Sequence, residues 1–283
     1  MGAGMSAVAS APESRPGSGA SPAGGVTLPR VLRSEWTKLS TLRSTRWSLL
    51  AAFVAMAGLG PLIAAAQMAR WSHLRPPERL TFDAINSGVG GWHLAQLAIG
   101  VLGVLVMTGE YTTGMIRSSL MAVPRRLPVL WAKLIVFALV TFGLMLIASL
   151  ISFLAVQAIV TQHHVQRSLS SPGALRVVIG TALFLMVLSA LCLGLGTILR
   201  NTAGGIAAFV ALLFVLPGIS AILPSSVNDS ISPYLPLNAG TTVATHTFDN
   251  SHHLAPWGGF ALFCGYAAVA IILAAVTLMR RDA

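Results

Sequence analysis

The chain of 283 residues is 55% hydrophobic and only 9% charged, whereas a soluble domain usually carries about a quarter charged residues. Its formal charge of +10 does not indicate a nucleic-acid surface, because the basic residues lie between long apolar runs instead of forming a basic patch. In hydrocarbon every backbone N–H and C=O must be paired within its element, which leaves helices or closed barrels. Barrel strands would alternate in polarity, so the unbroken apolar runs predict an all-α, polytopic membrane protein.

The first 46 residues divide into a tail and an amphipathic segment. Residues 1–29 are rich in Gly, Ala, Ser and Pro and are expected to form a disordered cytoplasmic tail. Within residues 30–46, apolar side chains such as Val31, Trp36 and Leu39 recur near helical spacing, with basic residues on the other faces. This pattern predicts a basic amphipathic helix on the membrane surface. The residues expected to define this interfacial helix are Glu35, Trp36, Lys38 and Arg43.

Six apolar runs of spanning length make residues 47–283 a predicted six-helix transmembrane domain, since about 20 apolar residues cross a bilayer. The runs cover residues 47–69, 92–108, 134–160, 175–199, 203–223 and 256–279. With the N-terminus inside, 13 of the 18 Lys and Arg residues fall on the cytoplasmic side. This bias predicts that both the N- and C-termini are cytoplasmic. The expected location is therefore the cell membrane, with multiple passes.

The most informative stretch is the predicted cytoplasmic segment 109–132, between the second and third spans. Glu110 and Arg117 are seven residues apart, which is two helical turns, so both side chains fit on one face. We expect a short helix parallel to the membrane, ended by Pro124. A carboxylate at a membrane boundary is costly to leave unpaired, so Glu110 should have a partner such as Arg117. Alternatively, Glu110 starts a helix and stabilises its N-terminal dipole.

The run E-Y-T-T-G-M-I-R at residues 110–117, followed by P-R-R at 124–126 and by Lys133, resembles the ABC type-2 (ABC-2) permease family. The entry segment 34–46 is similar to the amphipathic entry helix of actinobacterial members. Residues 193–205 and 234–240 also resemble that family. Together these four segments extend the resemblance over roughly residues 31 to 281.

The resemblance implies the membrane-spanning permease subunit of an ABC exporter, with a dimeric translocation pathway driven by a separate ATPase subunit. It also implies that residues 224–255 form an outer loop with re-entrant helices. The implied ATPase-coupling residues are Glu110, Tyr111, Thr113, Gly114, Arg117, Pro124, Arg125 and Arg126. Arg200, Asn201 and Thr202 would form a second, smaller cytoplasmic contact. An ATPase residue is then a further candidate partner for Glu110.

The family implies partners that this chain needs to function. No G-x-x-x-x-G-K-[ST] motif occurs in the sequence, so the chain is not its own ATPase by that route. We expect no cofactor on this chain, and ATP and Mg on the partner ATPase. The other expected partners are a second permease, as a homodimer or heterodimer, and membrane lipids, but no nucleic acid.

Two other classes of function are compared with transport. An intramembrane enzyme would need ionisable or nucleophilic groups inside the bilayer, yet the centres of the runs carry no Asp, Glu, Lys, Arg or His. G-x-S-x-G and H-E-x-x-H motifs are also missing from the sequence. The chain is therefore expected not to be an enzyme. An accessory or sensing membrane protein with a permease fold remains an alternative.

The histidines are all on the predicted outer side: His73, His93, His163, His164, His246, His252 and His253. Outer loops are where polar residues must lie in such a topology. No metal-ligand spacing such as H-x-x-x-H accompanies them, so no metal site is predicted.

Overall fold

The computed structural model describes residues 28–73, 75, 79, 82–114, 126–246 and 254–280. Every regular element among these residues is a helix, which confirms the all-α prediction. Six helical segments are long and apolar enough to cross a membrane, as the sequence predicted. They are Arg43–Ala69, Ala84–Thr112, Leu127–His163, Ala174–Leu199, Thr202–Ser220 and Pro256–Arg280.

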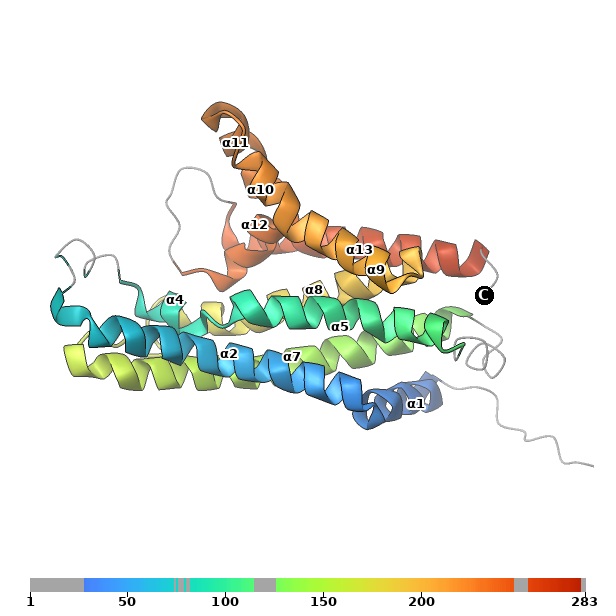
Figure 1. Ribbon diagram of the computed structural model, residues 1–283, viewed down its shortest axis with the longest axis horizontal. Coiled ribbons are helices and arrows are strands. Elements are labelled where there is room, and N and C mark those ends of the chain that lie inside the picture. The colour runs from blue at the N-terminus through green and yellow to red at the C-terminus, as the bar shows by residue number, and fades with distance from the viewer. Residues whose placement is uncertain are drawn as a thin grey trace, which may run out of the picture.

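Five of these six segments form a bundle in which long helices lie side by side (Figure 1). The long helices are α2 (Arg43–Ala69), α5 (Trp92–Thr112), α7 (Arg126–Val160), α8 (Ala174–Leu199) and α13 (Pro256–Arg280). Short helices accompany them: α4 (Ala84–Val89) before α5, and the 3-10 turns η1 (Trp71–His73) and η2 (Thr161–His163). The central helix is α8, which packs on α5, α7 and α13 and has 78% of its most apolar window buried.

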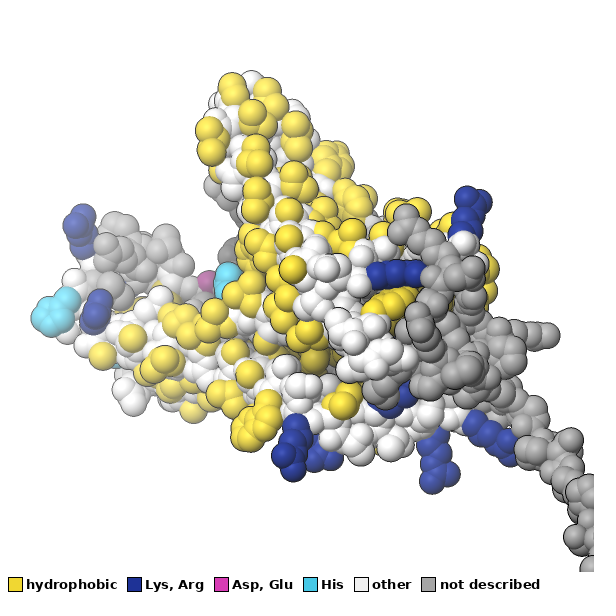
Figure 2. Space-filling model, turned by 45° about the vertical axis from the view of Figure 1, so that its right-hand side comes forward, with side chains coloured by type: hydrophobic (Ala, Val, Ile, Leu, Met, Phe, Trp, Pro, Cys, Tyr) yellow, Lys and Arg dark blue, Asp and Glu magenta, His cyan; other side chains and the backbone are white. Residues whose placement is uncertain are grey.

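The fifth span leaves the bundle. It consists of α9 (Thr202–Val210), a π-helical turn η3 (Ala211–Val215) and α10 (Leu216–Ser220), followed by α11 (Ser225–Ile231). Only 17% of its most apolar window is buried. Figure 1 shows α10 and α11 projecting away from the other helices, and Figure 2 shows hydrophobic side chains covering this arm. The arm therefore presents apolar surface outside the core of this chain.

The two ends of the bundle are built differently. Helix α1 (Leu28–Thr41) lies at the end where α13 finishes, here called the α1 end, and α4 lies at the opposite, α4 end (Figure 1). Near the α4 end the chain returns through η4 (Ser232–Tyr234), α12 (Pro236–Thr241) and η5 (Thr242–Ala244). Both α12 and η5 pack on α8 and α13. Short helices thus occupy residues 225–244, within the stretch 224–255 for which re-entrant helices stay a prediction.

Element boundaries near the predicted site residues differ from the sequence-based expectation. The interfacial helix ends at Thr41 and α2 begins at Arg43, because Leu42 between them is extended (φ −68°, ψ 118°). Arg43 is therefore the first residue of the first span and not part of the interfacial helix. Helix α5 continues to Thr112, so Glu110 lies in its last turn, and the alternative of a carboxylate at a helix start is wrong.

Candidate functional site

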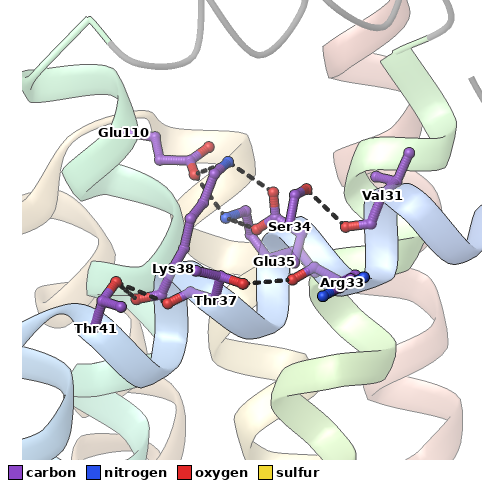
Figure 3. Close-up of polar contacts among 9 residues, drawn as sticks. Val31, Arg33, Ser34, Glu35, Thr37, Lys38, Thr41 and Glu110 are labelled. Atoms are coloured by element: carbon purple, nitrogen blue, oxygen red, sulfur yellow. Dashed lines mark hydrogen bonds and ion pairs between the residues drawn. The ribbon is translucent and has the colours of Figure 1, made fainter.

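Four charged side chains meet at the α1 end and form the charged tetrad, defined as Glu35, Lys38, Glu110 and Lys133. Lys133 Nζ donates to Glu35 Oε2 at 2.7 Å and to Glu110 Oε1 at 2.8 Å. Lys38 Nζ donates to Glu35 Oε1 at 2.7 Å and to Glu110 Oε1 at 3.0 Å. Figure 3 shows Glu110 reaching toward the α1 side chains. Each carboxylate thus contacts both ammonium groups, and the charges alternate around a closed ring.

Most of the tetrad is buried, so its members depend on one another. The exposed fraction of the side chain is 3% for Glu35, 4% for Lys133, 9% for Glu110 and 24% for Lys38. A buried charge without a partner costs several kcal/mol. The two positive and two negative charges sum to zero, which makes burial of the group tolerable.

Each tetrad residue is placed by a regular helical position. Glu35 belongs to the buried stripe Val31–Glu35–Leu39 of α1, where residues four apart share one face. Glu110 is in the last turn of α5, and Lys133 is in the second turn of α7. The tetrad therefore joins the helix preceding the first span to the two spans that flank residues 115–125.

The electrostatic environment favours the charged form of Lys38. Burial lowers the pKa of its ammonium group, but hydrogen bonds and charge attraction from Glu35 and Glu110 outweigh burial, so the pKa is raised above 10.5. Lys38 consequently remains protonated at neutral pH and holds its place in the ring.

A cavity of about 290 Å³ opens beside the tetrad, between α1, α2 and α5. All four tetrad residues line it, and its apolar wall consists of Leu39, Leu42, Leu102, Leu105 and Val106. Glu110 Oε2 is buried there, and among the described residues no group donates a hydrogen bond to it.

The second predicted contact, Arg200 to Thr202, lies against the same end of α5. The Arg200 guanidinium sits 5.2 Å from the ring centroid of Tyr111, close enough for a cation–π interaction. Thr202 Oγ1 donates to Thr108 Oγ1 at 2.9 Å. Asn201 caps α9 by accepting from the Gly204 N–H at 2.9 Å. The turn between α8 and α9 is therefore attached to the helix that carries Glu110.

The predicted coupling residues fall into two groups. Glu110, Tyr111, Thr113 and Gly114 lie at the end of α5, where Thr113 is its C-cap and Gly114 has φ +70°. Arg117, Pro124 and Arg125 lie outside the described residues, and so does the side chain of Arg126, the first residue of α7. The expected pairing of Glu110 with Arg117 therefore stays a prediction.

Sequence reasoning missed that two lysines are the partners of Glu110. It placed Lys38 on the interfacial helix and named Lys133 only as part of the family resemblance, with no link between them. One available signal was that these are the only two lysines of the chain. It also did not anticipate that Glu35 is buried, while Trp36, predicted on the apolar side of the interfacial helix, is 55% exposed and could contact lipid.

Metal-binding groups are not evident at the ends of the bundle. Within the described ranges, no group of three or more His, Cys, Asp or Glu residues is arranged to hold a metal ion. His252 and His253 lie outside those ranges.

Six apolar spans and a charged junction at one end define a multi-pass membrane protein. Comparison with protein families identifies which class of membrane protein it is: the model of the ABC-2 family transporter protein matches residues 31–218. The chain therefore belongs to the ABC-2 transporter membrane family. No curated protein matches the chain at the level of individual sequences.

Proposed function

We propose that the chain is the permease subunit of an ABC exporter in the cell membrane, driven by a separate ATPase subunit. Family membership supports a permease subunit and a transport role. The observation that carries the finer proposal is the charged tetrad, because it ties α1, α5 and α7 together at the end where α5 and α7 are connected.

The proposed coupling route begins in residues 115–125, the connection between α5 and α7. A displacement of this connection would be passed to Glu110, five residues before it, and to Lys133, eight residues after it. Both side chains bond to α1 or to each other through buried ion pairs. Helices α1, α5 and α7 would then move together, and a displacement at the ATPase interface would tilt these packed helices.

The proposed pathway is dimeric, and the fifth span, formed by α9, η3 and α10, is the surface we assign to the second permease. Its exposed apolar side chains include Val215, Leu216 and Ile219, which are 41–54% exposed. Its low burial contrasts with α8 at the centre of the bundle. A second copy, or a related permease, would cover this surface and enclose a path between the two chains.

The test is binding of a candidate ATPase subunit to this chain. In a complex purified in lipid nanodiscs, replacing Arg117, Arg125 and Arg126 with alanine should reduce ATPase recovery several-fold, because charged contacts to the coupling segment are removed. The matched control replaces Arg70, Arg75 and Arg79, three arginines on the predicted outer side, and should leave recovery unchanged. Equal recovery from both triple variants would contradict the proposed docking segment.

A further inference from the structure

His246 joins three segments at the α4 end. Its Nδ1 lies 2.9 Å from Asp83 Oδ2, in the residue before α4, and its Nε2 lies 3.0 Å from the carbonyl oxygen of Pro172, before α8. The backbone N–H of His246 also donates to Asn86 Oδ1 at 2.8 Å. We call Asp83, Asn86 and His246 the polar latch.

The geometry of the latch determines which form of the imidazole fits. The Pro172 carbonyl only accepts hydrogen bonds, and an ionised Asp83 carboxylate only accepts them. Both ring nitrogens of His246 must therefore carry a proton to make both bonds. A neutral ring makes only one and points a lone pair at the other acceptor. The imidazolium is thus the form that closes the latch.

The charged side chains described near the imidazole come from two segments. Asp83 faces it from the segment before α4, and the carboxylate is held by the N–H of Ile85 at 2.8 Å and by Asn86 Nδ2 at 3.1 Å. From α8, the Arg176 guanidinium donates to the carbonyls of Thr242 and Val243 in η5. Helices α4, α12 and η5 contain no charged residue. Among the described residues, the Asp83 carboxylate therefore supplies the negative charge near two groups, the permanently charged Arg176 guanidinium and the His246 imidazole.

The latch holds a segment that packs on α8 and α13 near the α4 end. The residues just before His246 form η5, whose Val243 and Ala244 are buried. A Cβ on Gly180 of α8 would lie 2.2 Å from the Val243 carbonyl oxygen, so η5 sits directly on the central helix. Releasing His246 would remove the attachment of this segment to α4.

We propose that Asp83, Asn86 and His246 form a proton-sensitive latch, which fastens η5 and α12 to α4 while His246 is protonated and loosens when it loses its proton. Histidine side chains change charge between about pH 5 and 8. A latch of this kind makes access through the α4 end depend on the pH on that side of the membrane. The proposal does not depend on an ATPase partner.

The experiment measures how often the closed segment opens. Ala244 is 1% exposed, so Ala244→Cys in a background with Cys192→Ala and Cys264→Ala reports opening through its maleimide labelling rate. The purified full chain in nanodiscs is labelled at pH 5.5 and pH 8.5, with and without His246→Gln. At each pH, the labelling rate of the His246→Gln protein is divided by the rate of the protein that keeps His246. This ratio removes the intrinsic pH dependence of thiol reactivity.

We expect His246→Gln to raise the labelling rate roughly tenfold at pH 5.5, the effect of losing one charge-assisted hydrogen bond, and to leave it nearly unchanged at pH 8.5. The matched control is His93→Gln, with ratios near one at both pH values, because the His93 ring lies 3.0 Å from Gly90 O and stacks on its neighbour Trp92. Asp83→Asn keeps the helix cap but removes the charge that favours the imidazolium, so it should raise the labelling rate more at pH 5.5 than at pH 8.5, which covers failure of the first variant to fold. Equal ratios at both pH values in either folded variant would overturn the proposal.

Discussion

At the scale of single residues, the tetrad is a ring and not a set of separate pairs. Each glutamate meets both lysines, at 2.7 to 3.0 Å. Because every contact joins opposite charges, the sign at each position is fixed by its two neighbours. Removing one partner from a buried pair typically costs about 3 to 5 kcal/mol.

The ring predicts an unusual result for a charge exchange. In Glu110→Lys/Lys133→Glu the exchanged pair keeps opposite charges, but position 110 then repels Lys38 and position 133 repels Glu35. We expect this double variant to melt well below the parent in detergent, as low as Glu110→Lys alone. Exchanging all four charges should recover much of the loss. An isolated 110–133 pair would instead tolerate the double exchange, and parental stability of that variant would disprove the ring.

The raised pKa of Lys38 predicts a loss of stability at alkaline pH. A folded-state pKa above the unfolded value of 10.5 means that this ion-pair stabilisation is complete below that pH. It disappears as the pH rises through the folded-state pKa. Lys38→Arg stays charged, so the melting temperature of the parent should fall relative to this variant only as the pH rises above about 10.5. Parallel curves for the two proteins would argue against Lys38 as an ion-pair donor.

At the scale of elements, the break at Leu42 decides how α1 meets the membrane. The helix stops, one extended residue follows, and α2 begins at Arg43. Sequence periodicity did not reveal this break, because Leu42 and Arg43 suit a helix by composition, and an extended residue there leaves no Pro or Gly signal. The break allows α1 to turn its Glu35 face onto α5 and α7.

Proline substitutions test the break. Arg43 is the first residue of α2 and follows an extended residue, which is where proline is best tolerated. Arg43→Pro should therefore melt within a few degrees of Arg43→Ala. Arg46→Pro loses the bond from its N–H to the Leu42 carbonyl, 3.1 Å long, and should be less stable than Arg46→Ala by about 3 kcal/mol. Similar losses from both prolines would indicate one continuous helix.

The sequence predicted the elements better than the site. Apolar runs identify all six spans, because burial in hydrocarbon requires long helices whatever their neighbours are. The approach of Glu35 to Lys133, 98 residues away along the chain, depends on how three helices pack, and no local pattern records it. His246 and Asp83 are likewise 163 residues apart. Glu110 was singled out because a carboxylate at a span boundary is conspicuous, but its partners came from tertiary structure.

At the scale of the whole molecule, both ends of the described chain lie at the α1 end (Figure 1). The distribution of Lys and Arg predicts that this end is cytoplasmic. Reporter fusions before residue 1 and after residue 283 should both be active only in the cytoplasm, whereas a tag between Ala244 and Leu254 should be accessible only from outside. Cytoplasmic labelling of the internal tag would reverse the orientation and place the latch on the inner side.

The central claim is that the charged tetrad couples the spans to an ATPase, and ATP hydrolysis by the assembled complex tests it most directly. Glu110→Gln keeps the shape of the side chain but leaves both lysines short of one negative charge. We predict that this variant retains its ATPase subunit while transport-linked ATP hydrolysis falls roughly tenfold, as expected for weakened charge-assisted hydrogen bonds. Asp229→Asn, an acid in the projecting α11, should have no such effect. An intact Glu110→Gln complex with parental transport-linked hydrolysis would contradict the account.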